Sequence, residues 1–234
     1  MFCYVITGRY KPQLLQMSNN LKRICHYLII FQLPAVDIGG FSAYNWRTLN
    51  NVVGFFMPRY FNAAQIPLTN RAFNDAEKLV SRNFRISEEE LKRKRYDVKT
   101  LVQLEEHEIK EGAFAHLCKY AYEKPAQLPD ADIKSFDFYR ICLQDNIILD
   151  AVERANSFIK FSPLMLYIAT HELIHVLRFS NGEIDFDASV EEKEQEEAIV
   201  HNLTKFVLQP VKHHDLDIVL DCFSSSFNIY DLYN

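Results

Sequence analysis

Residues 162–180 restrict the possible fold more than any other stretch, because an apolar helix pattern here includes three polar side chains. The stretch contains the pattern HExxH, with His171 and His175 four residues apart and Glu172 directly after the first histidine. On a helix, side chains four residues apart lie on one face about one turn apart, so both imidazoles can reach a single metal ion. The adjacent carboxylate can handle a proton. The pattern therefore predicts a metal site on a helix.

The flanking residues place this pattern in the middle of the helix. Ser162 suits the N-cap, Pro163 suits the first helical position, and residues 180–182 (Ser-Asn-Gly) have the residue types of a helix end. The apolar residues around the pattern predict a buried helix: Leu164, Met165, Ile168, Leu173, Ile174, Val176 and Leu177. Buried polar groups require partners. The two histidines therefore bind either a metal ion or, in a purely structural helix, hydrogen-bonding groups.

A second helix is predicted from Val190 to about Leu208, and it carries further candidate ligands on one stripe. Glu194, Glu197 and His201 are spaced three and four residues apart along it. A third protein ligand from this helix would complete a site that keeps one open position, as catalytic zinc sites do. From spacing alone, Glu197 and His201 are both candidates for that ligand.

The composition is that of an ordinary globular chain. Of the 234 residues, 48% are hydrophobic and 24% are charged, which allows one sizeable core or two small lobes. The net charge of -5 argues against a nucleic-acid partner, and no apolar run reaches the roughly 20 residues that span a membrane. The five cysteines lack paired spacing, and the start has no secretion signal. We expect a cytoplasmic protein.

Patterns outside these two helices predict a mixture of strands and helices. Short strands are expected in three segments rich in β-branched and aromatic residues, 2–7, 27–32 and 51–57. The alternative for 27–32 is the end of a helix that begins near Ser18. Residues 61–70, which include Pro67, are expected to form a connection. Helices are expected in three places: over 76–83, after the capping sequence Ser87 to Glu90, and after Asp97, with further helix from 113 to 122.

The stretch before the HExxH helix, 136–149, predicts two short strands with a turn at 144–146, or one bent strand. A strand there either pairs with an extended peptide or lies under the helix as part of the core. The expected fold class is α+β and helix-rich, with a small sheet next to the HExxH helix. We expect an N-terminal lobe of mixed structure, 1–135, and a metal-binding half, 136–234, in one compact unit.

The pattern HExxH followed by Glu197 on the next helix resembles the zincin metallopeptidases, in particular the glutamate-zincin (gluzincin) branch typified by thermolysin. The segment 138–210 also resembles the small intracellular ImmA/IrrE-type peptidases, which join HExxH to an acidic helix ending in an apolar run and a proline, here Pro210. Two residues depart from these patterns. His201 stands where gluzincins often have aspartate, and Ile174 stands where the intracellular peptidases commonly have glycine.

The resemblance implies a zincin-like fold and a zinc metallopeptidase, an endopeptidase acting on a peptide or protein substrate. It implies that Zn2+ is held by His171, His175 and Glu197 with water at the fourth position, and that Glu172 is the general base. Two other interpretations stay open: a catalytically silent zincin-fold module that binds metal for regulation or protein interaction, and a helical interaction protein in which HExxH is accidental. The sequence predicts neither the substrate's identity nor the oligomeric state.

Stabilising the oxyanion of peptide hydrolysis requires a further donor. Four side chains are candidates by position: Tyr167, Arg178, His213 and His214. The alternative for Tyr167 is packing in the core, and for the histidine pair it is a solvated loop. A thiolate from Cys118 or Cys142 could also block the metal as a latency ligand, although nothing nearby marks either thiol as reactive.

Overall fold

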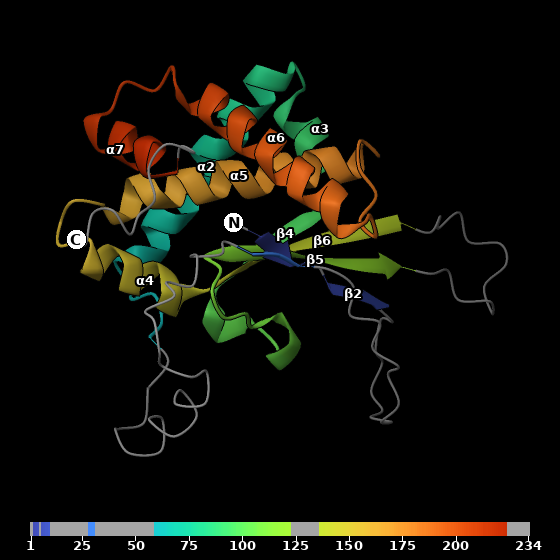
Figure 1. Ribbon diagram of the computed structural model, residues 1–234, viewed down its shortest axis with the longest axis horizontal. Coiled ribbons are helices and arrows are strands. Elements are labelled where there is room, and N and C mark those ends of the chain that lie inside the picture. Colours follow the sequence, from blue (N-terminus) through green and yellow to red (C-terminus); the bar gives the residue numbers. More distant parts are fainter. Residues whose placement is uncertain (1, 5, 10–27, 31–58, 123–135, 224–234) are drawn as a thin grey trace, which may run out of the picture.

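The framework of the fold is a mixed sheet with helices packed against one of its faces (Figure 1). The computed structural model describes residues 2–4, 6–9, 28–30, 59–122 and 136–223. Four strands form the sheet in the order β2 (Ile6–Arg9), β5 (Ala115–Tyr122), β6 (Phe136–Leu143) and β4 (Tyr96–Lys99). β5 and β6 are antiparallel, whereas the edge strands β2 and β4 run parallel to β5 and β6, respectively.

A separate two-stranded ribbon consists of β1 (Phe2–Tyr4) and β3 (Leu28–Ile30), which pair antiparallel. These strands confirm the predictions over 2–7 and 27–32, except that the first segment contains β1 together with the start of β2. The strand predicted over 51–57 lies outside the described residues, as does the chain after 223.

The main helices are α2 (Gln65–Phe84), α5 (Phe161–Ser180), α6 (Val190–Leu208) and α7 (His214–Cys222). Figure 1 shows them stacked on one side of the sheet, where α5 contacts β5, β6 and the other three helices. Two short helices complete the described set, α3 (Glu88–Lys92) and α4 (Asp145–Arg154). Two 3-10 turns, η1 (Leu101–Gln103) and η2 (Glu106–Glu108), lie on the opposite side of the sheet, in green in Figure 1. This arrangement confirms a mixed fold of helices and a small sheet.

The core is built around α5 because apolar side chains cover this helix on nearly all sides. Leu164, Ile168, Leu173, Ile174 and Val176 are each at most 1% exposed. A helix that is apolar all round must be enclosed by other elements. The sheet, α2 and α6 enclose α5. Any polar side chain in the middle of this helix is therefore held in the interior.

The ends of α5 differ slightly from the prediction. The helix begins at Phe161, so Ser162 is not its N-cap and Pro163 occupies the third helical position. Proline is tolerated there, because the N–H groups of the first turn have no acceptor within the helix. At the other end, Asn181 is the C-cap and Gly182 has a φ of 70°, a left-handed conformation that glycine adopts without strain. The HExxH pattern lies mid-helix, as predicted.

The predicted boundaries of α6 are confirmed, and a capping box sets its start. Ser189 Oγ accepts a hydrogen bond from Glu192 N at 3.2 Å, and Glu192 Oε2 accepts one from Ser189 N at 2.9 Å. Of the capping box predicted for α3, the N-cap bond is present, since Ser87 Oγ accepts from Glu90 N at 3.0 Å. Both helices therefore begin where local sequence signals placed them.

Two segments predicted as helical are strands. Asp97, predicted as a helix cap, lies in β4, where its carboxylate accepts hydrogen bonds of 2.9 and 2.8 Å from Arg140 on β6. Residues 113–122, predicted as helix, contain β5. Leu117 and Cys118 are both buried, although neighbouring side chains on a strand point to opposite faces. A strand covered on both faces lacks the apolar and polar alternation that would have identified it.

Two further corrections concern α2 and α4. The predicted connection over 61–70 contains the first turns of α2, in which Pro67 takes a first-turn position that tolerates proline. Only the first of the two strands predicted over 136–149 exists, because α4 begins at Asp145. The Asp145 carboxylate is buried and accepts hydrogen bonds from Phe61 N at 2.9 Å and Leu101 N at 3.0 Å. The predicted turn is thus the junction between β6 and α4, and hydrogen bonds to backbone N–H groups far away in the sequence hold it in place.

The two faces of the sheet carry different side chains. Leu117 and its register partner Ile141 belong to the core beneath α5, whereas the neighbouring Cys118 and Cys142 point to the face turned away from it. The main core draws on residues before and after the predicted division at 135, which itself lies outside the described ranges. Within the described ranges, no helix has the length and apolar character needed to cross a bilayer.

Candidate metal centre

The predicted site residues on α5 and α6 come together in the interior. His171 and His175 are fully buried on one face of α5, and Glu197 of α6 is 4% exposed. One donor atom from each lies within 4.8 Å of the other two. The two imidazole Nε2 atoms are 3.1 Å apart, and His175 Nε2 lies 2.7 Å from Glu197 Oε1. His171 Nε2 lies 3.6 Å from Glu197 Oε2.

The chemistry of this group fits a divalent cation. Both oxygens of Glu197 are buried, and neither makes a hydrogen bond of regular geometry with a described residue. A buried carboxylate requires compensation of its charge. Two imidazole nitrogens and one carboxylate oxygen form a donor set that suits Zn2+ and leaves a coordination position open. The same donors accept other divalent metals, so the donor set is compatible with zinc without being selective for it.

Thr204 on α6 orients the first histidine. Its hydroxyl donates to the backbone O of Val200 at 2.7 Å, and the same oxygen lies 3.5 Å from His171 Nδ1. Because the hydroxyl hydrogen is already used, the Thr204 oxygen can only accept from Nδ1–H. This contact selects the tautomer in which His171 Nε2 has a free lone pair. Metal-ligating histidines are commonly held in this way through the other ring nitrogen.

The second histidine has a different environment. Within the described part of the chain, His175 Nδ1 has no hydrogen-bond partner. Its ring stacks on Phe179 one turn further along α5, with centroids 6.0 Å apart. Aromatic packing, together with the contact of its Nε2 with Glu197, therefore limits the rotation of His175.

His201 lies close to the group of three but is not part of it. Its Nδ1 is 2.6 Å from the Tyr167 hydroxyl, and its ring centroid is 5.1 Å from that of His171. Burial, together with the neighbouring His171, lowers the pKa of His201 to about 3, so the ring is neutral near pH 7. Of the two candidates for a third ligand, the structure brings Glu197 to the imidazoles and pairs His201 with Tyr167.

The charges within the group are coupled. Burial acts to raise the pKa of Glu197, but His175 and His171 outweigh it and hold this pKa well below the usual range of a carboxyl. Burial lowers the pKa of His171. For His175, burial acts in the same direction, but the charge of Glu197 overrides it and raises the pKa. In the metal-free protein, the charge of Glu197 therefore favours the protonated form of His175.

Glu172, the predicted general base, is fully buried beside the group. Burial is the main cause of the raised pKa of Tyr167, and the charge of Glu172 adds to it. Burial acts to lower the pKa of His175, and Glu172 helps Glu197 to raise it. Glu172 is not one of the three converging donors. This position is compatible with a carboxylate that handles protons next to the site.

An ion pair fastens α6 to α5 one turn beyond the site. Arg178 donates to both carboxylate oxygens of Glu196, from Nε at 2.6 Å and from Nη2 at 2.9 Å. Its Nη1 also donates to Glu183 at 2.5 Å. The Glu196 carboxylate is almost completely buried. Arg178, which the sequence offered as an oxyanion donor, is thus engaged in holding the helix that carries Glu197.

The remaining candidates lie away from the group. Glu194 is exposed on α6, and His213 and His214 are exposed at the start of α7. Tyr167 is buried, stacked on Phe223 with centroids 4.4 Å apart, and hydrogen-bonded to His201 as described. Sequence reasoning did not single out Thr204; its only signal was a hydroxyl seven residues after Glu197, on the same helix face.

Cys118 and Cys142 belong to a different group, on the sheet face turned away from α5. The latency hypothesis requires a thiolate at the His171 and His175 imidazoles. The sheet separates the two groups, so neither thiol reaches those imidazoles in this arrangement of the chain.

Comparisons with known proteins identified no relative. No protein-family model, no curated protein and no solved structure matches the chain. The resemblance to zincins is therefore carried by the HExxH pattern and the position of Glu197 alone.

Proposed function

We propose that this chain is a zinc-dependent metallopeptidase with a zincin-like site, hydrolysing a peptide bond of a peptide or protein substrate. One observation carries the proposal: the two imidazoles of HExxH and the carboxylate of Glu197 from the next helix lie within 4.8 Å of one another. The free cysteines Cys118, Cys142 and Cys222 support the accompanying proposal of a cytoplasmic, reducing location.

In this proposal, His171, His175 and Glu197 hold the ion, and Thr204 keeps the first imidazole in the ligating tautomer. A zinc ion bound there supplies Lewis acidity and lowers the pKa of its water to about 7. Glu172 accepts a proton from the attacking water and passes it to the leaving amine. Arg178 contributes indirectly, because its ion pair with Glu196 fixes the position of α6.

A second candidate is a metal-binding regulatory or protein-interaction module without turnover. The observation that favours it is burial: His171, Glu172 and His175 are all 0% exposed. A substrate carbonyl must approach the metal, so a peptidase needs the described elements to open or a substrate to enter past them. A metal that only stabilises the fold requires neither.

The variant Glu172→Gln separates the two candidates. It retains the size and hydrogen-bonding capacity of the side chain but removes the base. We expect zinc content to stay near that of the parent while hydrolysis of a denatured protein substrate falls by roughly 10²-fold or more. Glu194→Gln, the same change at an exposed position of α6, is the matched control and should retain both properties.

His175→Ala tests the metal site itself, and it should lose about one zinc per chain. A Glu172→Gln protein as active as the parent would exclude Glu172 as the base. If the zinc-loaded parent cleaves no protein substrate while His175→Ala binds about one zinc fewer per chain, the regulatory module is the better conclusion.

A further inference from the structure

A second group of metal-ligating side chains lies on the sheet face turned away from α5. His116 and Cys118 are two residues apart on β5, and Cys142 of β6 is the cross-strand partner of His116. Side chains two residues apart on a strand share a face, so the three converge. One donor atom from each lies within 4.8 Å of the others, and the two Sγ atoms are 3.5 Å apart.

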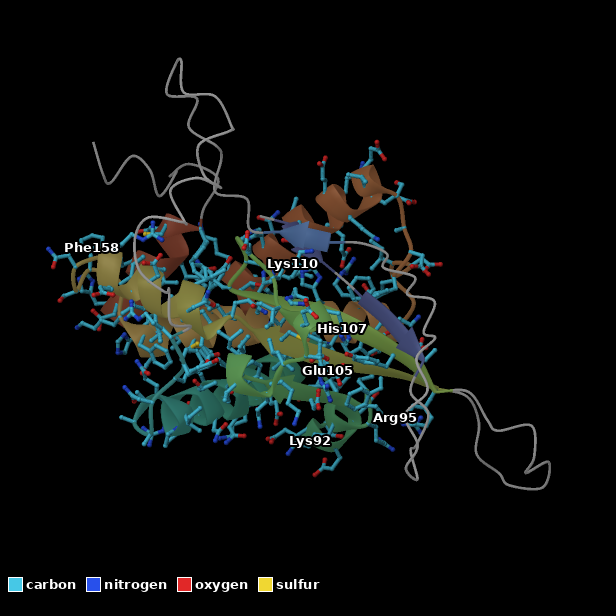
Figure 2. All side chains as sticks on the ribbon, turned by 90° about the horizontal axis from the view of Figure 1, so that it is seen from below. Lys92, Arg95, Glu105, His107, Lys110 and Phe158 are labelled. Carbon is cyan, nitrogen blue, oxygen red and sulfur yellow. The ribbon has the colours of Figure 1, made fainter. Side chains whose placement is uncertain are left out.

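The group is closed off from solvent. His116, Cys118 and Cys142 are all 0% exposed. The segment from η2 to Lys110 covers this side of the sheet, and Figure 2 shows Glu105, His107 and Lys110 on it, viewed from below. Gln144 fastens this cover, because its Oε1 accepts from Lys110 N at 3.0 Å and its Nε2 donates to the backbone O of Glu108 at 3.1 Å. The site is therefore part of the interior.

The imidazole of His116 has a buried donor atom that could bind a metal ion. Within the described residues, its Nε2 is buried and has no hydrogen-bond partner. Its Nδ1 lies 3.5 Å from Gln144 Nε2, but the two hydrogens of that amide have closer acceptors, the backbone O of Glu108 at 3.1 Å and of Cys142 at 3.3 Å. Buried polar atoms almost always have a partner. Coordination of a metal ion by this imidazole would supply one.

The charged side chains near the two cysteines already neutralise one another, so they would not neutralise two thiolates. Two cationic side chains among the described residues lie on this face near the cysteines, Arg140 and Lys99. Asp97 and Glu108 already balance them: Arg140 lies 2.8 Å from Asp97 and 3.1 Å from Glu108, and Lys99 lies 3.9 Å from Asp97. Two thiolates beside these groups would need another positive charge. Two thiolates and one imidazole form a donor set that strongly favours Zn2+, a tetrahedral ion with affinity for sulfur and nitrogen.

We propose that His116, Cys118 and Cys142 form a second, structural zinc site on the opposite side of the sheet from His171, His175 and Glu197. The ion joins β5 to β6 behind the cover made by η2. It shares no ligand with the first group, so it does not depend on the proposed peptidase function. These three donors leave one position of a tetrahedral ion for a water molecule.

Cobalt titration tests this proposal with a signal that is specific for thiolate ligands. The full chain is purified under reducing conditions, freed of metal and titrated with Co2+ alone. Bound by two cysteines, Co2+ gives an intense near-ultraviolet thiolate-to-metal charge-transfer band, which a site of two histidines and a glutamate lacks. We expect the band to form in the parent and in His175→Ala, and Zn2+ to abolish it. Zinc content should be about two per chain in the parent and about one in His175→Ala.

The variants Cys118→Ser and Cys142→Ser should lose the band and about one zinc per chain. Cys222→Ser removes another buried thiol, on α7 and outside the group, and should retain both. His116→Gln leaves both thiols in place and should weaken Co2+ binding by at least about 10-fold, which keeps the test informative if a serine variant fails to fold.

Three results would overturn the proposal. The first is a fully reduced parent that gives no charge-transfer band. The second is a band that persists in folded Cys118→Ser and Cys142→Ser proteins. The third is a denatured, freshly purified parent with no more free thiols than the double variant Cys118→Ala, Cys142→Ala. Equal counts would identify a disulfide between Cys118 and Cys142 in place of the ion.

Discussion

Replacing Thr204 by valine tests whether α6 orients a zinc ligand on α5. Valine has nearly the shape of threonine, so the change removes the hydroxyl that faces His171 Nδ1 at 3.5 Å without opening a cavity. Without this acceptor, the tautomer with a free Nε2 lone pair loses its preference. Loss of such a partner typically weakens metal binding by roughly 10- to 100-fold. Because 3.5 Å is long for a hydrogen bond, we expect the lower end, about tenfold or about 1.4 kcal/mol.

Thr170→Val is the matched control for this experiment. Thr170 is also fully buried, and its hydroxyl donates to the backbone O of Leu166 at 2.8 Å, the same local bond that Thr204 makes. In the described structure it has no hydrogen bond to a site imidazole. Both variants should change the free energy of unfolding of the metal-free protein by similar amounts, within about 1 kcal/mol.

Competition with a chromophoric zinc chelator at fixed pH measures both affinities. The Cys118 and Cys142 thiols are blocked or replaced beforehand. The measured affinity is then that of the His171, His175 and Glu197 site alone. Thr170→Val should bind zinc within about twofold of the parent. Equal affinities for Thr204→Val and Thr170→Val would refute the orienting role of Thr204.

Three further predictions follow from the same site. Arg178→Met leaves the buried Glu196 carboxylate without its partner and should lower the free energy of unfolding by about 3 kcal/mol in urea titrations, whereas the double variant with Glu196→Met should recover most of this loss. Burial acts to lower the pKa of His175, but Glu197 raises it above 6.5, so protons compete with zinc at this nitrogen. Zinc affinity should therefore rise as pH increases through that raised pKa. The stability that protonated His175 gives the metal-free protein, present below pH 6.5, is lost over the same range. With the Cys118 and Cys142 thiols replaced, calorimetry in buffers of different ionisation enthalpy should detect about one proton released per zinc. Glu197→Ala should lose the first zinc and His201→Ala should keep it, as measured by metal analysis; the reverse result would make His201 the third ligand.

The helices of the candidate site could be predicted from sequence because their signals are local. HExxH fixes the relation of His171 to His175 within one turn of helix. The boundaries of α6 follow from the Ser189 capping box and from the residues that follow it. Such signals do not depend on the rest of the chain, so the mid-helix position of HExxH and the predicted bounds of α6 were confirmed, although the Ser189 capping box itself was not predicted and the α5 cap was placed two residues late.

The strands around the site were harder to predict because their causes are distant in sequence. Asp97 has a residue type that suits a helix cap, yet its hydrogen bonds go to Arg140, on a different strand. β5 carries buried residues on both faces. The helix α5 covers one face, and the segment near η2 covers the other. No window of sequence around β5 contains either element.

The supporting contacts of the site depend on how two helices cross. Thr204 meets His171, and Tyr167 meets His201, only because α5 and α6 pack against each other. The sequence placed these residues on the right helices but gave no register between the helices. For the same reason it left the choice between Glu197 and His201 open.

The capping box of α6 also determines which changes in chain length this protein can tolerate. Ser189 and Glu192 start the helix by bonds to each other, so the loop after α5 does not set the phase of α6. Extra residues in that loop alter only its path. One residue inserted between Glu192 and Glu197 instead turns every later side chain by about 100°, which moves the carboxylate off the imidazoles. Homologous chains that keep the site should accordingly differ in loop length between the two helices while preserving the count of residues from the cap to the carboxylate.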